Sequence, residues 1–426
     1  MLSKNSLTNI FELFVLPLLS FWIIFGELRY LVNSPIFFVF IFLVVFFIVC
    51  LFVIKLIARI KNKDYIKLRL LVVIFICLFI LTIIFSIAMI NRQQIDSKLT
   101  HDGALLTEFA ADLILEGKNP YVENYSKTLL YDWDLPGGLL QVNNVAIKNP
   151  ALDYYIYPPL NFLVLVPFRA IFEMDYRYLL AVFFIISYLA LLVLFKDYKN
   201  KIIISILYLL NPFLVSVTLF GMNEVIVLSL FIISIIFLHK KKLWLSAIFF
   251  ALAILFKQYL ILFLPFYLIY LLVKNNKCLR EVIIIFVIIS TIFLPFLIWN
   301  FNAVVEDVVL FPLGLTESVY PITGFSLLSI LYNKNVIDDM YYAPNWSLIL
   351  QVVICLPLLA YFLYLIYKKK RISWTIMLFA IWLIVFWFLA RFFNINYIAF
   401  CLHLLVLSYI WYLIEKEKEK INEKTN

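Results

Sequence analysis

The sequence LLVVIFICLFILTIIFSIAMI occupies residues 70–90 and contains no charged side chain. A helix of this length extends about 30 Å, which matches the thickness of the hydrocarbon core of a bilayer. Comparable apolar runs recur along the chain, and they do not alternate in polarity as barrel strands do. Only a helix or a closed barrel satisfies the backbone polar groups in hydrocarbon. The sequence therefore predicts an all-α, polytopic transmembrane helical protein.

The composition places the chain among membrane proteins and argues against nucleic-acid binding. Of the 426 residues, 65% are hydrophobic and 14% are charged, whereas soluble domains are about half apolar and a quarter charged. The net charge is +9, but Lys and Arg cluster in short connections between apolar runs, as positive-inside bias predicts. The cysteines show neither a disulfide framework nor metal-ligand spacing; they are Cys50, Cys77, Cys278, Cys355 and Cys401.

Basic residues between the apolar runs set the predicted orientation. The densest basic connection, residues 55–69, is expected in the cytoplasm, which also places the N-terminus there and residues 91–159 outside. The first apolar run has no small-residue cleavage site and is expected to be a retained helix. The apolar segment 157–172 could be a span, but it would then invert every later basic cluster. We therefore interpret it as an interfacial or re-entrant segment on the outer face.

This interpretation predicts a plasma-membrane protein with about 12 spans and both termini in the cytoplasm. No internal repeat of the kind found in many secondary transporters is evident. The C-terminal tail is expected to be a solvated helix end. The predicted organisation is transmembrane helices 1–3 at residues 1–90, an extracytoplasmic loop with amphipathic and juxtamembrane helices at 91–177, helices 4–9 at 178–299, a second extracytoplasmic loop at 300–346, helices 10–12 at 347–414 and a charged cytoplasmic tail at 415–426.

The first extracytoplasmic loop contains a predicted amphipathic helix. Apolar residues follow helical spacing at positions 105, 106, 109, 110, 113 and 114. On the opposite face, Glu108, Asp112 and Glu116 form an acidic stripe that we expect to face solvent. Gly117 and Pro120 mark the end of this helix.

Asp102 stands at the start of this helix. Asp is a favoured N-cap residue, so it could serve only to begin a helix at Gly103. A carboxylate on the outer face beside a lipid-phosphate cleft could instead act as general base towards an incoming hydroxyl group. His101 adjoins it but has no partner at metal-ligand spacing. The other histidines are weaker candidates, because His239 belongs to a basic cluster and His403 lies alone within an apolar helix.

Two cations stand apart from the positive-inside pattern. Lys257 and Arg391 each lie at the predicted outer end of an apolar helix with no second basic residue beside them. Such a side chain can extend to the interface without a further role. Alternatively, both reach into an outer-leaflet cavity and hold the phosphate of a lipid carrier, because isolated cations at membrane depth are functional candidates.

Two further clusters have both a structural and a functional interpretation. The sequence Asp132-Trp133-Asp134 has the form that chelates Mg²⁺ or Mn²⁺ in many sugar-transferring enzymes. The Leu-Pro-Gly-Gly sequence at 135–138 favours a turn instead, so the ion is a candidate cofactor that the sequence does not require. Asn223 and Glu224 begin an apolar helix, where Glu224 suits the helix dipole or the pair binds substrate hydroxyl groups.

Several motifs follow one another in a characteristic order. Asp102 follows a predicted transmembrane helix, Gly-Lys-Asn-Pro-Tyr ends the amphipathic helix at 117–121, and Tyr-Pro-Pro-Leu at 157–160 precedes Arg177. Gly-Met-Asn-Glu at 221–224 and Phe-Lys-Gln-Tyr at 256–259 form predicted outer turns. These motifs resemble those of the GT-C superfamily of integral-membrane glycosyltransferases, particularly its polyprenol-phosphate-dependent, mannosyltransferase-like branch. The resemblance covers residues 99–265, and beyond them it rests on topology and on Arg391 with Asn396 and Tyr397.

The resemblance implies an inverting transfer of a mannose-like sugar from a polyprenyl-phosphate donor to a lipid-linked or envelope-glycan acceptor on the non-cytoplasmic face. It implies Asp102 as the base, with Lys257 and Arg391 binding the donor phosphate. Glu224 stands where Asp is commoner in the family, and the insert between residues 121 and 157 is longer than expected, so the acceptor stays open. The implied substrate-binding residues are Asn119, Tyr121, Tyr157, Arg177, Asn223, Glu224, Gln258 and Tyr259.

Two other functions stay open at this stage. A lipid-linked oligosaccharide polymerase or ligase would have a catalytic cluster in a large late outer loop. The loop at 300–346 is acidic and aromatic, with Lys334 as its one basic residue. A transporter or flippase would have charged residues in mid-membrane along a path, and the sequence has almost none.

Overall fold

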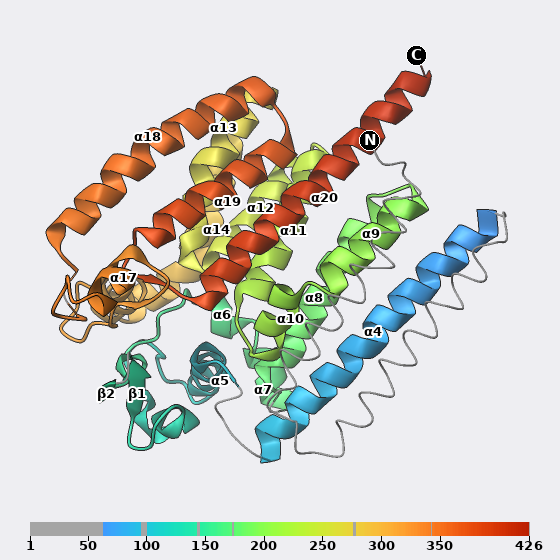
Figure 1. Cartoon of the computed structure of the whole chain (residues 1–426). Helices are drawn as coiled ribbons and strands as arrows, with labels where there is room; N and C mark the ends of the chain where they lie inside the picture. Colours follow the sequence, from blue (N-terminus) through green and yellow to red (C-terminus); the bar gives the residue numbers. More distant parts are fainter. Residues whose placement is uncertain are drawn as a thin grey trace.

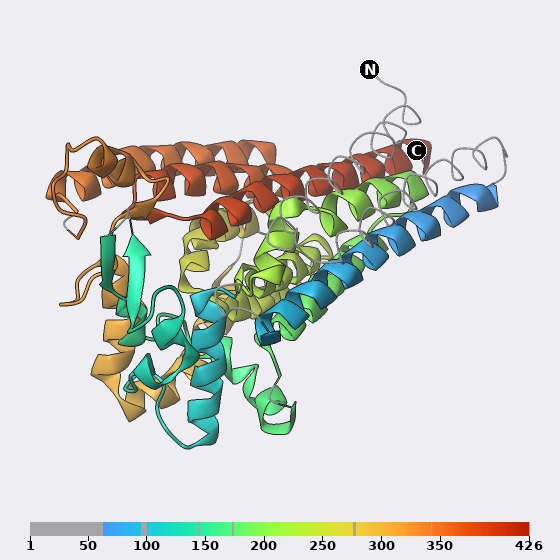
Figure 2. The ribbon, with the colours of Figure 1, turned by 60° about the horizontal axis from the view of Figure 1, so that its bottom comes forward.

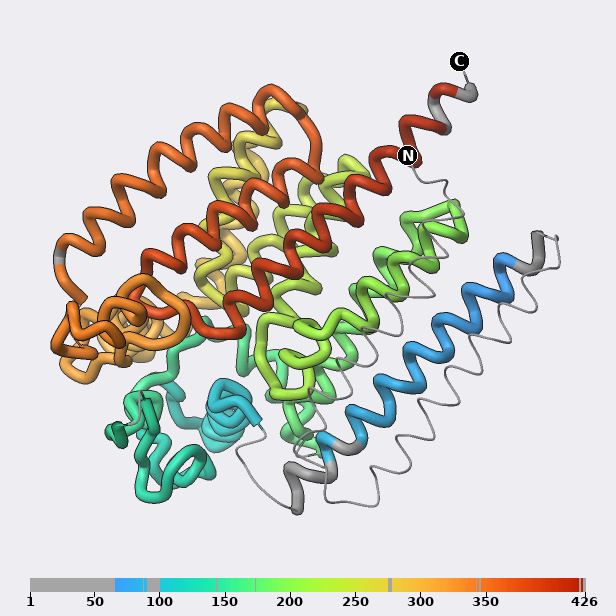
Figure 3. The backbone as a smooth tube through the Cα atoms, viewed as in Figure 1, coloured from blue at the N-terminus to red at the C-terminus, as the bar shows by residue number. Residues whose placement is uncertain are grey.

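The computed structural model describes residues 63–94, 100–142, 145–172, 174–275, 278–341 and 343–425, and Figure 3 traces the backbone. The spans predicted at residues 10–25 and 36–54 lie outside these ranges. The first elements are α4 (Lys63–Gln94), α5 (Asp102–Leu115), η4 (Tyr125–Lys127), η5 (Leu129–Asp132), β1 (Leu139–Val142), β2 (Val145–Lys148), η6 (Pro150–Leu152), α6 (Leu160–Leu163), α7 (Val166–Phe172), α8 (Tyr176–Val193), α9 (Tyr198–Leu209), α10 (Pro212–Leu219) and α11 (Glu224–His239).

The second half of the chain is also predominantly helical. Its two short strands pair with each other in parallel, whereas β1 and β2 form an antiparallel hairpin. The remaining elements are α12 (Leu243–Phe256), η7 (Gln258–Phe263), α13 (Leu264–Asn275), α14 (Leu279–Trp299), α15 (Phe301–Val305), the π-helical turn η8 (Glu306–Leu310), α16 (Phe311–Leu313), β3 (Thr323–Gly324), α17 (Leu327–Asn333), α18 (Asn345–Lys369), α19 (Ile372–Phe388), β4 (Phe392–Phe393) and α20 (Ile395–Thr425).

Helix length identifies an integral membrane protein. Of the described helices, five are long and apolar enough to cross a membrane, namely α4, α8, α14, α18 and α20. The pair α9 and α10, bent by 44°, would make a sixth span. Other apolar helices, including α11, α12 and α19, have 10–17 residues. A membrane-spanning helical fold is thus confirmed, whereas the predicted count of about 12 spans and the loop layout are not.

A break divides the apolar run 202–220, which is one of the spans predicted within residues 178–299. The side chain of Asn211 accepts hydrogen bonds from the backbone N–H groups of Phe213 and Leu214, at 3.1 and 3.2 Å, and so caps a new helix. Pro212 occupies the first turn of that helix and cannot donate a hydrogen bond back to α9. The chain therefore changes direction between α9 and α10.

The long helices lie side by side, and the polar elements gather at one end of the bundle. Helix α11 packs on α8 and α12, α12 packs on α14, and α19 packs on α20 (Figure 1). In Figures 1 and 2, α5, the β1–β2 hairpin and α17 lie at the end opposite the C-terminus. The fold thus collects segments from distant parts of the sequence around one end of the helices.

The acidic face of α5 is not solvated as predicted. Glu108 is buried, and its Oε1 accepts the backbone N–H of Tyr176 at 2.8 Å. Asp112 receives two hydrogen bonds from the guanidinium of Arg169, at 2.8 and 2.5 Å. The prediction of a solvated stripe is wrong for Glu108 and Asp112, because α7 and the start of α8 cover this part of the face, and it is confirmed for Glu116, which is exposed and pairs with the exposed Lys118. The predicted end of the helix is confirmed, since Gly117 has a φ of 73° just beyond it.

The C-terminal tail makes specific contacts rather than ending as a solvated helix. Helix α20 continues to Thr425. The carboxylate of Glu417 accepts the backbone N–H groups of Lys196 and Asp197, each at 2.9 Å. Glu415 accepts the N–H of Ile372 at 2.8 Å. The tail therefore caps the starts of α9 and α19, where acceptors are most favourable.

Candidate active site

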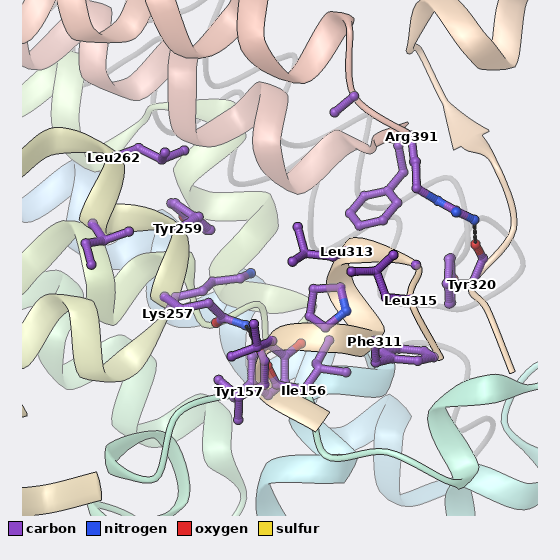
Figure 4. A pocket seen from close by; sticks show the side chains of 18 of the residues that line it. Ile156, Tyr157, Lys257, Tyr259, Leu262, Phe311, Leu313, Leu315, Tyr320 and Arg391 are labelled. Atoms are coloured by element: carbon purple, nitrogen blue, oxygen red, sulfur yellow. Dashed lines mark hydrogen bonds between the residues drawn. The ribbon is translucent and has the colours of Figure 1, made fainter. Parts of the chain in front are cut away.

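A cavity of about 1010 Å³ lies at the end of the bundle where α5 is found. This volume is at the upper limit of small-molecule sites, which enclose roughly 300–1,000 Å³. Its lining is mostly apolar and includes residues of α14 and α18. Asp102, Lys257 and Arg391, from three distant parts of the sequence, all line it. Figure 4 shows Lys257 and Arg391 on opposite sides, with Leu313 and Leu315 between them.

Lys257 is held in a buried polar cluster. It follows the last residue of α12 in an extended conformation, and only 6% of it is exposed. Its ammonium group donates to Asn223 Oδ1 at 2.8 Å and forms an ion pair with Glu224. Asn396 Nδ2 donates to Glu224 Oε1 at 2.8 Å. Three aromatic rings lie 5.5–5.6 Å from the ammonium group, which suits cation–π attraction; they belong to Tyr157, Tyr259 and Tyr397.

Arg391 reaches the cavity from the connection between α19 and α20. Its Nη2 donates to the carbonyl oxygens of Tyr320, at 2.9 Å, and Tyr341, at 3.3 Å. The guanidinium lies against Gly314, whose missing side chain leaves the necessary room. Within the described ranges no carboxylate lies within ion-pair distance of Arg391, and its Nε has no hydrogen-bond partner. Burial lowers the pKa of Arg391, which still carries a charge at any physiological pH.

The first turn of α5 brings Asp102 into the cavity wall. The helix begins at Asp102 and its N-cap is His101, one residue earlier than predicted. The backbone N–H of His101 donates to Phe220 O at 2.6 Å, and the indole N–H of Trp133 donates to Thr100 O at 2.6 Å. Neighbouring elements therefore fix this segment from two sides.

His101 and Asp102 form a close pair. The Nδ1 atom of His101 lies 2.8 Å from Asp102 Oδ1. The backbone nitrogen of Gly103 lies 2.6 Å from that carboxylate oxygen and 3.0 Å from Nδ1. A Cβ at Gly103 would collide with the Tyr157 hydroxyl, so only glycine lets Tyr157 lie this close to the pair.

Burial and charge act in opposite directions on the pair. Burial alone raises the pKa of Asp102, but the charge and hydrogen bond of His101, the Gly103 N–H and the charge of Lys257 together lower it below its usual value. Burial alone lowers the pKa of His101, but Asp102 and the charge of Glu224 raise it above 6.5, against the opposing charge of Lys257. Asp102 therefore stays ionised, and His101 titrates above its ordinary range.

Gln258 and Tyr259, predicted to bind substrate, also line the cavity. The Gln258 amide donates to the carbonyl oxygens of Ile156, at 2.9 Å, and Val308, at 3.1 Å, and so joins two cavity walls. The Tyr259 ring packs edge-on against Trp387 at 5.1 Å. Its buried hydroxyl has no hydrogen-bond partner among the described residues.

Other predicted site residues lie behind the walls. The Asn119 side chain accepts the N–H of Tyr121, whose hydroxyl donates to Tyr157 O at 2.9 Å. Arg177 is fully buried, and its guanidinium binds Asp175 and two backbone carbonyl groups. Their contacts support the cavity wall and the start of α8, and a role in substrate binding stays a prediction.

The Asp132-Trp133-Asp134 segment leads into the β1–β2 hairpin. Asp132 accepts the N–H of Gly137 at 2.9 Å, and Asp134 accepts the N–H of Gln141 at 2.5 Å. In the part of the chain that the structure describes, no group of three or more His, Cys, Asp or Glu residues is arranged to hold a metal ion. Both carboxylates thus take part in turn geometry, and metal binding stays a prediction.

Sequence reasoning did not select Asn161, which connects three elements at the site. Its Oδ1 accepts the hydroxyl groups of Thr107, at 2.7 Å, and Tyr155, at 3.0 Å. Its Nδ2 donates to the carbonyl of Phe256 at 3.3 Å, directly before Lys257. The sequence signal that could have identified Asn161 is a lone amide side chain within the apolar segment 157–172. Because this side chain is buried and bonded next to Lys257, it supports the position of Lys257.

Comparison with known proteins identifies the family. Residues 121–423, well over half of the chain, match the model of the EpsG family, and the chain therefore belongs to the EpsG family. This is a family of membrane proteins of glycosyltransferase-like or polymerase type. No curated protein sequence and no solved structure matches. The matched range includes Lys257 and Arg391 but begins after Asp102, and it does not specifically support the GT-C mannosyltransferase resemblance.

Proposed function

We propose that the cavity binds a lipid-linked sugar and that the protein transfers this sugar to a glycan hydroxyl group, as a polymerase of lipid-linked oligosaccharides on the non-cytoplasmic face of the plasma membrane. The EpsG family supports a membrane glycosyl-transfer or polymerase role. Arg391 carries the proposal, because it is a cation in a mostly apolar cavity with no carboxylate partner among the described residues. A guanidinium fork matches the oxygens of a phosphate.

The proposed roles follow from the chemistry of the lining. Arg391 binds the phosphate that leaves with the lipid, and the apolar residues of α14 and α18 accommodate its hydrocarbon chain. The His101–Asp102 pair takes the proton of the acceptor hydroxyl as this oxygen attacks the anomeric carbon and the sugar–phosphate bond breaks with inversion. Fixed positive charge near the departing phosphate stabilises the transition state.

A second candidate is the transfer of a single mannose-like sugar from a polyprenyl phosphate. The position of Asp102 in the cavity, outside the range matched by the family, favours it. The two candidates share the base and the phosphate contact, and they differ in the donor. The polymerase requires a lipid-linked oligosaccharide and yields a ladder of products, whereas the second candidate adds one sugar.

Reconstitution into vesicles tests the proposal. The purified protein is given radiolabelled donors of each kind, a polyprenyl-diphosphate oligosaccharide and a polyprenyl-phosphate mannose, together with an acceptor glycan. We expect a product ladder with the oligosaccharide donor, and single addition from the monosaccharide donor would favour the second candidate. Donor movement across the bilayer without transfer would indicate a flippase and overturn the proposal. A parallel reaction with a chelator decides whether Asp132 and Asp134 hold a required ion.

A further inference from the structure

The two ring nitrogens of His101 have different surroundings. Nδ1 lies 2.8 Å from Asp102 Oδ1, whereas Nε2 has no hydrogen-bond partner among the described residues. His101 lines the cavity, and 27% of its side chain is exposed there. An unpartnered, accessible ring nitrogen beside a fixed carboxylate is the arrangement in which histidine acts as a proton acceptor.

Geometry also decides which nitrogen carries the proton of the neutral ring. Without a proton on Nδ1, two lone pairs would face each other across 2.8 Å beside an ionised carboxylate. The Gly103 N–H, which is within reach of both groups, lies closer to the carboxylate, at 2.6 Å against 3.0 Å. Nδ1 can accept this N–H only when it carries no proton. With the Gly103 N–H assigned to the nearer carboxylate oxygen, Nδ1 carries the proton and donates to Asp102, and the lone pair of the neutral ring is on Nε2.

We propose that Nε2 of His101 is the atom that receives the proton of the acceptor hydroxyl, with Asp102 as the residue that positions the ring. The inference rests on the proposed glycosyl transfer. The acceptor oxygen forms a bond to the anomeric carbon with the electron pair of its O–H bond, and the proton moves to Nε2. The sugar–oxygen bond breaks, and the leaving phosphate keeps that electron pair. The ionised Asp102 stabilises the resulting imidazolium.

Charges from every neighbouring element bear on this assignment. Asp102 and Glu224 place negative charge near His101, and Lys257 places positive charge near it. Asp102 and Glu224 raise the pKa of His101 above its usual value against burial and Lys257, whereas His101, the Gly103 N–H and Lys257 lower the pKa of Asp102 against burial. A histidine with a raised pKa is a stronger base than a carboxylate with a lowered pKa. The aromatic hydroxyl groups near Asp102 stay protonated because burial raises their pKa; they belong to Tyr157 and Tyr320.

The pH dependence of the transfer rate distinguishes the two bases. If neutral His101 is the base, the rate rises with pH through an apparent pKa above 6.5. If Asp102 is the base, the rate is constant from about pH 5 upwards. Burial raises the pKa of Asp307 to about 8, so its titration could be mistaken for that of His101. The profile of Asp307→Asn removes this ambiguity, because the rise with pH is expected to persist in that variant.

Substitutions sharpen the test. We expect His101→Gln to lower the rate by about 10²–10⁴-fold, the usual contribution of a general base, and to abolish the rise with pH. Asp102→Asn should lower the rate and move the rise to lower pH, because the pKa of His101 loses its nearest negative charge. The matched control is His239→Gln, at the C-terminal end of α11, and this variant should keep the wild-type pH profile. Thermal unfolding identifies variants that fail to fold.

Each outcome has one meaning. An active wild type whose rate is constant across this pH range overturns the role of His101 and leaves the proposed function standing. The same holds if folded His101→Gln keeps the wild-type rate. A wild type that is inert with every donor overturns the proposed function and this inference together.

Discussion

Lys257 and Arg391 line the same cavity, yet the protein surrounds them in opposite ways. Lys257 is 6% exposed, ion-paired with Glu224 and enclosed by tyrosine rings. Arg391 is partly exposed and held by two backbone carbonyl groups, without a carboxylate in the described ranges. The sequence predicts the same phosphate-binding role for both.

The difference shows that the partner of a cation decides whether its charge is available to a ligand. Lys257 and Glu224 are close to neutral as a pair, and their main energetic effect concerns folding, because an isolated charge in their place would be very costly. Arg391 keeps its charge available for an anion. We therefore propose that the phosphate binds chiefly at Arg391 and that Lys257 organises the wall next to it.

The largest effect is expected when Lys257 loses its charge. Lys257→Met leaves Glu224 as a buried, unpaired carboxylate, which should cost about 3–5 kcal/mol of the free energy of unfolding. Denaturation of the detergent-purified protein measures this change. The double variant Lys257→Met with Glu224→Gln removes both charges and should recover most of the loss. A loss below about 1 kcal/mol in the single variant would contradict the view that this pair is buried and coupled.

Arg391→Ala should affect catalysis more than stability. Loss of a charged hydrogen bond to the donor phosphate is worth about 1.5–3 kcal/mol, so kcat/KM for the lipid-linked donor should fall about 10–100-fold. Arg391→Lys should fall by less, because it keeps the charge and loses the fork. Arg371→Ala, at an exposed ion pair with Glu419, is the matched control. Unchanged donor kinetics in Arg391→Ala would remove the observation that carries the proposed function.

Local sequence signals predicted the helices well. The uninterrupted apolar run at 70–90 lies within α4, and the spacing around Leu105 and Leu106 lies within α5, whose predicted end at Gly117 is also confirmed. These features follow from periodicity and from backbone preferences of single residues, which need no tertiary information. The positive-inside pattern of charges and the resemblance to a glycosyltransferase superfamily led us to expect Asp102, Lys257 and Arg391 at one site. The three residues line one cavity.

Features that depend on tertiary contact could not be predicted. Glu108 looks like a solvated acid on a helical wheel, but its carboxylate accepts a hydrogen bond from the backbone N–H of Tyr176, which is distant in the sequence. The pairing of Glu224 with Lys257 joins residues 33 positions apart, one at the start of α11 and the other just after α12. Nor does the sequence indicate that Arg391 lies against Gly314. In each case the partner is determined by packing of elements, which a single sequence does not reveal.

Gly314→Ala tests the position of Arg391 while keeping its charge. A Cβ at Gly314 would overlap the guanidinium, and the residue has a φ of 73°, which favours glycine. We expect a several-fold loss in kcat/KM for the donor, smaller than that of Arg391→Ala. Gly117→Ala is the control, because it has the same φ of 73° with nothing within 4 Å of the added Cβ. In both variants the left-handed φ should cost about 1–2 kcal/mol in the free energy of unfolding, and equal kinetic effects would mean that backbone strain alone is responsible.

The smallest effect is expected at Asn396. Its side chain donates to Glu224 Oε1 at 2.8 Å, so Asn396→Ala should cost about 1 kcal/mol in the free energy of unfolding. Asn394→Ala, just before α20 and bonded to Thr323 instead of Glu224, is the matched control. Because Asn396 and Lys257 both act on one carboxylate, combining Asn396→Ala with Lys257→Met should give a non-additive loss. Strict additivity would mean that the cluster around Glu224 is not one electrostatic unit, and the contrast between Lys257 and Arg391 would then lose its physical basis.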